Sequence, residues 1–359
     1  MFKKILVANR GEIAVRIVRA CSEMGIKSVA IYADADRQAL HVKKADEAYN
    51  IGADPVAGYL NAHNIVNLAV ASGCDALHPG YGFLSENPEL AEICARRGIK
   101  FIGPNASVIR QMGDKIQARN AMTTAGIPCT PGSDGNLENL DEAVALAKKI
   151  GYPVMLKATN GGGGRGIRRC DSEKELLSNY DRVISEASKA FGKPEVFLEK
   201  CVVSPRHIEV QVLADSQGNV IHLFERDCSI QRRNQKLIEI APSPQLTQAQ
   251  REYIGGLAVK AAKAVGYENA GTVEFLLDSD NTFYFMEMNT RLQVEHTVTE
   301  TITGIDIVQE QIRVAFGLPL QYVQKEVQFR GYAMEFRINA EDPKNDFLPS
   351  FGKITRYYS

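Results

Sequence analysis

Residues 153–170 read PVMLKATNGGGGRGIRRC, and this stretch decides between two folds that use glycine-rich loops. It formally contains the G-x-G-x-x-G pattern of dinucleotide-binding domains, but that fold requires a helix after the glycines. Strand-like residues stand on both sides here, so we expect a hairpin whose glycine tip brings bare amides close to phosphates. The alternative is a plain flexible hairpin, which four consecutive glycines make costly in backbone entropy.

Lys157 lies in the apolar strand just before this loop. A cation in such a strand needs a partner, and we expect a nucleotide phosphate; the alternative is an ammonium group that reaches solvent. The P-loop pattern GxxxxGK[ST] does not occur in the sequence, which excludes a P-loop enzyme at the level of motifs.

A second hairpin is predicted from GTVEFLLD and TFYFMEMN, with DSDN as a signal for a four-residue turn. That turn places Glu274 opposite Glu287, where two carboxylates repel by up to ~1 kcal/mol. A divalent cation removes the conflict, and oxygen ligands favour magnesium or manganese. Asn289 follows on the same face as a third ligand candidate. The alternative is a polar strand that faces solvent.

The same alternation continues beyond this strand through Arg291, Gln293 and Glu295. Acid, amide and guanidinium groups on one face suit phosphate and metal chemistry. A further basic segment, ERDCSIQRRNQK at residues 225–236, could bind phosphate, carboxylate or nothing.

Around these hairpins the chain alternates strands and helices. Residues 3–8, a helix from Ile13, and residues 27–34 predict a strand–helix–strand unit with parallel strands. This pattern recurs over about the first 110 residues, so we expect a small open α/β domain. Further helices are predicted near 172–190, 247–265 and 304–316, and a last strand over 333–341. The fold class is therefore α/β, in part α+β.

Composition excludes several classes of protein. The 359 residues carry a formal net charge of −1, which gives no bulk-charge argument for binding nucleic acid or an anionic membrane. No run approaches the ~20 apolar residues of a transmembrane helix. The seven cysteines form no CxxC pair, so we expect neither a disulfide framework nor a zinc site, and a cytoplasmic location.

The order of motifs identifies a family. The chain resembles biotin carboxylase, a member of the ATP-grasp superfamily, through the motifs ILVANRGEIA, HPGYGFLSEN, MGDK, GGGGRG, ERDCSIQRR, EMNTRLQVEH and EFRINAEDP. The resemblance covers essentially the whole chain. Through QRRNQKLIEIAP the chain is also similar to the biotin carboxylase subunit of two-subunit pyruvate carboxylases. The motifs do not separate this subunit from the biotin carboxylase component of acetyl-CoA carboxylase.

The resemblance implies an ATP-grasp fold preceded by an open Rossmann-like domain. The implied domains are residues 1–113, an ATP-grasp domain over 114–330 with a mobile lid at about 131–204, and an incomplete C-terminal β-rich domain over 331–359. The implied reaction joins bicarbonate to biotin on a carrier protein with ATP and magnesium or manganese. The implied partners are a biotin carboxyl carrier protein or domain, a carboxyltransferase subunit and, if the C-terminal domain is complete, a second copy of the chain.

The resemblance also assigns roles to individual residues. The implied ATP-binding residues are Lys115, Lys157, Gly162, Gly163, Gly164, Glu199, Lys200, Val202, His207, Gln231, Asn234 and Leu276. The implied bicarbonate pocket consists of Lys236, Arg291, Gln293 and Val294, and the metal ligands are Glu274, Glu287 and Asn289. Glu295 matches the general base, Arg337 matches the residue that stabilises the biotin enolate, and Lys236 and Arg291 are also counted as catalytic.

The sequence departs from the family pattern at Asn234, where many members carry His, and at Thr297, where Pro is usual. It also stops at Ser359, where the family continues, which leaves dimerisation of this chain open. Two alternatives remain at this stage: another ATP-grasp ligase with an acyl-phosphate intermediate, or an inactive truncated ATP-binding fragment.

Overall fold

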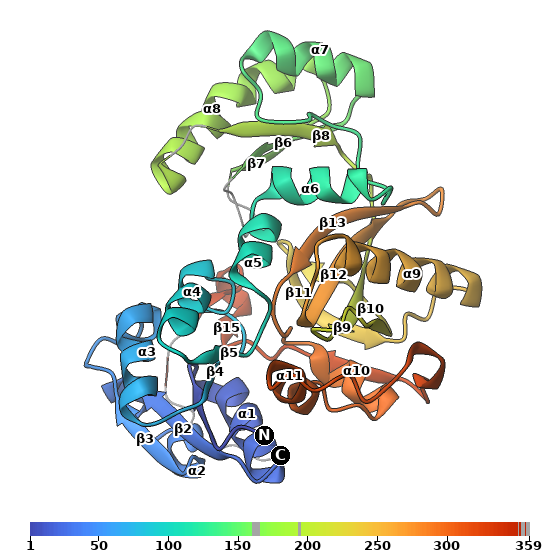
Figure 1. The fold of residues 1–359 in the computed structure, drawn as a ribbon. Coiled ribbons are helices and arrows are strands. Elements are labelled where there is room, and N and C mark those ends of the chain that lie inside the picture. The colour runs from blue at the N-terminus through green and yellow to red at the C-terminus, as the bar shows by residue number, and fades with distance from the viewer. Residues whose placement is uncertain (160–165, 193–194, 351, 353–355, 357–359) are drawn as a thin grey trace.

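The computed structural model describes residues 1–159, 166–192, 195–350, 352 and 356. Figure 1 shows an α/β body at the lower left, a body built on a larger sheet at the right, and a small α/β body that stands apart at the top. The bodies follow one another along the chain, except that residues 115–124, which pack against the large sheet, come before the top body.

The first body is built on a five-stranded parallel sheet in the order β3-β2-β1-β4-β5. Its strands are β1 Lys4–Val7, β2 Lys27–Tyr32, β3 Glu47–Asn50, β4 Ala76–His78 and β5 Lys100–Phe101. Its helices are α1 Gly11–Glu23, α2 Leu40–Lys44, α3 Ala62–Ala71, α4 Pro88–Arg96 and α5 Ala106–Gly113. This is the predicted Rossmann-like domain, and it forms because the apolar strands β1, β2 and β4 are buried between helices.

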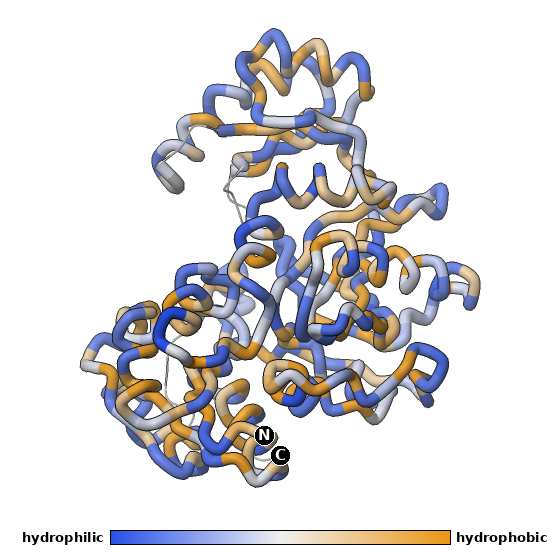
Figure 2. Tube along the Cα trace, in the orientation of Figure 1, coloured by the Kyte–Doolittle hydropathy of each residue, from blue (hydrophilic) through white to orange (hydrophobic). Residues whose placement is uncertain are grey.

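The top body packs two helices on a three-stranded antiparallel sheet in the order β7-β6-β8. Its elements are α7 Leu140–Ile150, β6 Val154–Ala158, β7 Ile167–Cys170, α8 Glu173–Phe191 and β8 Val196–Lys200. The helices alternate between hydrophobic and hydrophilic residues along their length, as helices with one buried face do (Figure 2). Strands β6 and β7 run antiparallel on either side of the glycines, so the predicted hairpin is confirmed for its two strands.

The third body contains a six-stranded antiparallel sheet in the order β13-β12-β9-β10-β11-β14. Its strands are β9 Arg206–Ala214, β10 Val220–Arg232, β11 Gln235–Ala241, β12 Asn269–Leu277, β13 Phe283–Asn289 and β14 Ala333–Phe336. The helices of this part of the chain are α6 Lys115–Thr124, α9 Gln248–Ala264, α10 His296–Thr303 and α11 Ile307–Ala315. One core packs α6 and α9 against one face of this sheet, through residues such as Met122, Ile254 and Val210.

Short elements complete the fold. A small strand pair joins β15 Glu341–Asp342 and β16 Leu348–Pro349. Single-turn helices lie at Asp34–Asp36, Ala57–Leu60, Gln324–Glu326 and Pro343–Asn345. Within the ranges that the structure describes, no helix combines the length and the apolar character needed to cross a membrane.

Three details differ from the prediction. Helices α2, α5, α7 and α10 were not predicted, because α2, α5 and α10 are short and α7 follows a loop rich in turn signals. The last predicted strand, 333–341, ends at Phe336, since β14 pairs with β11 only from Ala333 to Phe336. The predicted helix near 304–316 begins later, at Ile307, with Asp306 as its N-cap.

Candidate active site

The main cleft has a volume of about 810 Å³ and lies between the large sheet and the β6–β7 hairpin. Strands from both bodies line it, so its walls come from parts of the chain more than a hundred residues apart. The predicted site residues that line it are Lys157, His207, Gln231, Asn234, Lys236, Glu274, Leu276, Glu287, Asn289, Arg291, Gln293, Glu295 and Arg337. A neighbouring cavity of about 230 Å³ adds Lys115 and Glu199 and shares Lys157, Asn234 and Glu287.

The β12–β13 hairpin places Glu274 directly opposite Glu287, as predicted. The route to this pairing differs from the expected one. Leu277 pairs with Phe283, so the loop holds one residue more than the predicted turn, and the register shifts by one between Phe275 and Glu274. This β-bulge restores the pairing of the two carboxylates and re-aims the end of β13 into the cleft.

The two facing carboxylates have opposite electrostatic environments. Burial would raise the pKa of Glu274, but Lys236 and His207 outweigh burial and lower it. Burial and the charge of Glu274 raise the pKa of Glu287. Asn289 donates to Glu274 Oε1 at 2.9 Å, and its amide oxygen accepts from Arg291 Nη2 at 3.0 Å. Two buried carboxylates and an amide oxygen are donors that suit magnesium or manganese, which would also relieve the repulsion.

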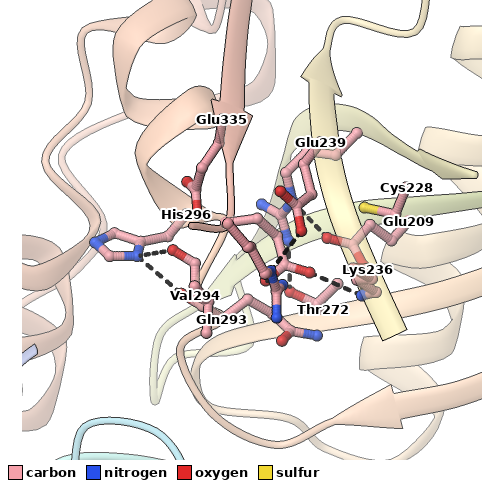
Figure 3. A network of polar contacts seen from close by, with 12 residues as sticks. Glu209, Cys228, Lys236, Glu239, Thr272, Gln293, Val294, His296 and Glu335 are labelled. Carbon is pink, nitrogen blue, oxygen red and sulfur yellow. Dashed lines mark hydrogen bonds and ion pairs between the residues drawn. The ribbon is translucent and has the colours of Figure 1, made fainter. Parts of the chain in front are cut away.

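Lys236 on β11 is the central cation of the site. Its ammonium group lies 2.5 Å from Glu209, 2.9 Å from Glu274 and 2.8 Å from Glu295. Figure 3 shows Lys236 beside Glu209, with further acidic side chains converging on the same region. Burial opposes the charge of Lys236, but the three carboxylates outweigh it and raise its pKa, so the group stays protonated.

Glu295 stands at the N-cap position of helix α10 without making a side-chain cap. It is completely buried, with both carboxylate oxygens occupied. One oxygen accepts from Lys236 at 2.8 Å and the other accepts from Arg337 Nη2 at 2.8 Å. The carboxylate is thus held between two cations at the wall of the cleft. A fixed carboxylate beside cations can take a proton from an anionic substrate that those cations bind.

Arg291 is held in a planar array at the end of β13. It donates through Nη2 to Asn289 at 3.0 Å and through Nη1 to the side-chain oxygen of Gln293 at 2.9 Å. Its Nε donates to Glu86 of the N-terminal body at 2.9 Å. The segment HPGYGFLSEN therefore contributes an acidic anchor to this site, a contact that sequence reasoning did not identify.

The nucleotide side of the cleft carries the remaining predicted residues. Lys157 on β6 is half-buried and forms an ion pair with Glu199 on β8. Burial lowers the pKa of Lys115, while the charge of Glu287 opposes this change. His207 lies 2.9 Å from Gln231 and 2.7 Å from Glu274, and the Glu274 carboxylate outweighs burial and raises the pKa of His207.

Asn234 sits in the tight turn between β10 and β11. Arg232 pairs with Gln235 across the turn, and the two residues between them, Arg233 and Asn234, have φ of 52° and 61°. Asn tolerates this left-handed conformation better than most residues do. The departure from the family pattern at this position therefore fits the local backbone.

Some predicted residues are not brought into these cavities. Lys200 donates to the carbonyl oxygens of Gly151 and Tyr152 at 2.9 and 3.0 Å, and Val202 lines neither cavity. Val294 lines neither, although its neighbours Gln293 and Glu295 do. Gly162, Gly163 and Gly164 lie outside the described residues.

Sequence reasoning missed the buried polar residues behind the site. Glu209 and Arg226 are both completely buried and form an ion pair at 2.5 Å. A signal was available: in RHIEVQVLA, polar His207, Glu209 and Gln211 alternate with apolar residues, which predicts one polar face of a buried strand.

Paired carboxylates in a cleft bounded by the antiparallel strands β6 and β7 are the architecture of ATP-grasp enzymes, and the chain is a member of that class. Residues 1–109 match the family model for the biotin carboxylase N-terminal domain. Residues 114–323 match that for the carbamoyl-phosphate synthase L chain, ATP binding domain.

Relatives narrow the class to one family. The chain is 60% identical to the 2-oxoglutarate carboxylase small subunit of Hydrogenobacter thermophilus, over 100% of this chain and 76% of the relative. It is 56% identical to biotin carboxylase 1 of Bacillus subtilis, over 99% of this chain and 80% of the relative. The solved structure of the biotin carboxylase domain dimer of the Hydrogenobacter enzyme, with MgADP, ADP and bicarbonate, superposes with a TM-score of 0.96 at 60% identity, covering 100% of this chain and 79% of that one.

The chain belongs to the biotin carboxylase family, and it is an ATP-dependent carboxylating ligase. The family resemblance predicted from the motifs is confirmed.

Proposed function

We propose that the cleft carboxylates biotin in two steps, with the predicted residues in the roles that their positions support. In the first step, bicarbonate lies against Lys236, Arg291, Gln293 and the backbone of Val294. Glu295 takes the bicarbonate proton, the bicarbonate oxygen bonds to the γ-phosphorus of ATP, and the bond from that phosphorus to ADP breaks. The products are ADP and carboxyphosphate. Lys236 and Arg291 balance the charge that develops on the transferring group.

In the second step, carboxyphosphate splits into carbon dioxide and phosphate. The phosphate takes the proton from the ureido nitrogen of biotin, and that nitrogen forms its bond to carbon dioxide. Arg337 lines the cleft, and its guanidinium offsets the charge of the biotin enolate. Closure of the cleft excludes water, which would otherwise hydrolyse carboxyphosphate.

ATP is assigned to the region between the two cavities. Lys115 and Lys157 bind its phosphates, and the loop containing Gly162, Gly163 and Gly164 covers them. The predicted contacts on the base and ribose side are Glu199, Lys200, Val202, His207, Gln231, Asn234 and Leu276. Glu274, Glu287 and Asn289 would hold magnesium or manganese, which supplies positive charge to the phosphates when bound.

One observation carries this proposal: the buried carboxylate of Glu295 is held between Lys236 and Arg337 in the wall of the cleft. This arrangement couples a base for bicarbonate to the cation assigned to biotin.

The test is ATP hydrolysis with magnesium and bicarbonate, measured with and without free biotin. We expect biotin to stimulate hydrolysis, and we expect Glu295→Gln to abolish both reactions, whereas Arg337→Ala abolishes the stimulation alone. Arg110→Ala, which removes a surface ion pair with Glu92, is the matched control and should behave as the wild type. Full biotin stimulation in Arg337→Ala would refute the assigned role of Arg337.

The partners and limits of the chain are also proposals. A biotin carboxyl carrier protein or domain presents the biotin, a carboxyltransferase subunit uses the product, and two copies of the chain associate. The proposed domain limits are 1–113, 114–330 with a lid at 131–204, and 331–359, as the family resemblance implies. Strand β14, at the start of the last range, pairs with β11 in the large sheet. All seven cysteines are free thiols, which supports the cytoplasm as the compartment.

A further inference from the structure

Glu239 on β11 contacts the active site from behind. It is completely buried and does not line the cleft, yet its carboxylate accepts from Arg337 Nε at 2.7 Å. Arg337 donates through Nη2 to Glu295 at 2.8 Å, so one guanidinium joins two carboxylates. Figure 3 shows Glu239 on its strand, above the cluster that includes Lys236.

The backbone aims Arg337 at this carboxylate. Arg337 follows the end of β14, and its N–H donates to the carbonyl of Leu237 on β11 at 2.9 Å. The side chain then reaches along β11 to Glu239. Its guanidinium side chain remains 27% exposed, so it still faces the cleft.

Glu239 has no other role that its contacts explain. Its Oε2 atom is buried without a hydrogen-bond partner among the described residues. Burial raises the pKa of Glu239 to about 7, with Arg337 opposing this rise and the charges of Glu295 and Glu335 adding to it. Burying a carboxylate beside two other acids is unfavourable. The ion pair with Arg337 is the contact that accounts for Glu239 at this position.

We propose that Glu239 is a positioning residue that fixes the Nε edge of Arg337, so that the guanidinium touches Glu295 with one amino group and presents the rest to biotin. This inference rests on the proposed role of Arg337. Without the negative charge of Glu239, the guanidinium can turn toward Glu295 as a bidentate partner and withdraw from the cleft.

The test compares Glu239→Gln with Glu335→Gln in ATP hydrolysis with and without biotin. Glu335 is the matched control because it pairs with Glu239 in the β11–β14 register and is half-buried, but it accepts from Thr297 and not from Arg337. We expect Glu239→Gln to lower the biotin-stimulated rate by about tenfold or more, and to change the biotin-independent rate by less than about threefold. Glu335→Gln should change both rates by less than about threefold.

A second readout separates positioning from general damage to the fold. With Glu239 ionised the guanidinium is held, and with Glu239 protonated the hold weakens, so the biotin-stimulated rate of the wild type should fall as pH drops through about 7. The charged groups that face Glu239 are Glu335 on β14, Arg337 just after β14, and Glu295 at the start of α10. Glu239→Gln should remove this limb of the pH profile.

Three results would overturn the inference: undiminished biotin stimulation in Glu239→Gln, equal losses in Glu239→Gln and Glu335→Gln, or an unchanged pH profile. If Glu239→Gln also loses the biotin-independent reaction, Glu239→Asp is tested in its place. That variant keeps the negative charge but moves it away from Arg337, because its side chain is one methylene shorter. A loss of stimulation of about threefold or more is then expected, and no loss overturns the inference. Stimulation that survives in Arg337→Ala would instead refute the proposed role of Arg337.

Discussion

Replacing the buried Arg226 should destabilise the protein more than any surface substitution. Its side chain is completely buried and donates to Glu209 at 2.5 Å, to Gln211 at 2.8 Å, to Thr299 at 3.0 Å and to Thr272 at 3.1 Å. Arg226→Met keeps most of the volume and removes every one of these bonds. Glu209 is then left buried with Lys236 as its remaining charged partner.

The magnitude follows from the loss of one member of a buried ion pair. Removing one member of a buried ion pair costs about 3–5 kcal/mol, which is a large part of a typical free energy of unfolding of ~5–15 kcal/mol. Glu209→Gln should cost a similar amount, because it leaves Arg226 buried without its carboxylate. The double variant loses the pair together, so its cost should fall short of the sum of the two single costs by about 2 kcal/mol.

The assay is urea unfolding of the four proteins, followed by circular dichroism and by tyrosine fluorescence, since the chain has no tryptophan. Arg110→Met, which removes an ion pair exposed on the surface, is the control and should leave the midpoint of unfolding in place. Additivity of the two single costs to within about 0.5 kcal/mol would refute the reasoning, because the two residues would then not act as a pair.

Three further predictions test other parts of the structure. Gly271→Ala should lower the free energy of unfolding by about 1–3 kcal/mol in thermal unfolding, because the new Cβ would lie 2.4 Å from the hydroxyl of Tyr267. An unchanged melting temperature would show that the Tyr267 side chain moves aside without cost. Burial lowers the pKa of His78 to about 3 and that of His296 to about 4, so both stay neutral in the folded protein while the unfolded chain takes up protons below pH ~6.5. The free energy of unfolding should therefore fall by about 1.4 kcal/mol per pH unit for each group as pH drops from ~6.5 to ~4. In melting curves His296→Asn should reduce this slope. An equal slope in that variant would contradict the inference that His296 stays neutral in the folded protein. Glu287→Gln should raise the magnesium concentration needed for half-maximal ATP hydrolysis by about tenfold or more, and chelation of the metal should stop the reaction in the wild type; an unchanged magnesium requirement would remove Glu287 from the proposed ligands.

Local patterns in the sequence were sufficient for much of the fold. The glycine-tipped segment between two strands pointed to a hairpin, and β6 and β7 pair as that prediction requires. The alternation of the late strands was sufficient to oppose Glu274 and Glu287. These features depend on residues near one another in the chain, where strand periodicity fixes which side chains share a face.

The bulge in the β12–β13 hairpin shows where local reasoning stops. The expected four-residue turn and the observed longer loop lead to the same pairing of Glu274 with Glu287, because the bulge compensates for the extra residue. Nothing in the local pattern distinguishes these two routes. The choice depends on how the whole hairpin packs against α6 and β9.

The sequence by itself determined the α/β class, the family and the chemical types of the site residues, because motifs of glycine, carboxylate and guanidinium groups are local and specific. Only the tertiary structure decided which charges meet. Glu86 reaches Arg291 across 205 positions of the chain, and Glu239 reaches Arg337 across 98. The pKa and orientation of each group depend on burial and on partners brought close by the sheet, and Coulomb interactions depend on distance in space rather than on separation in sequence.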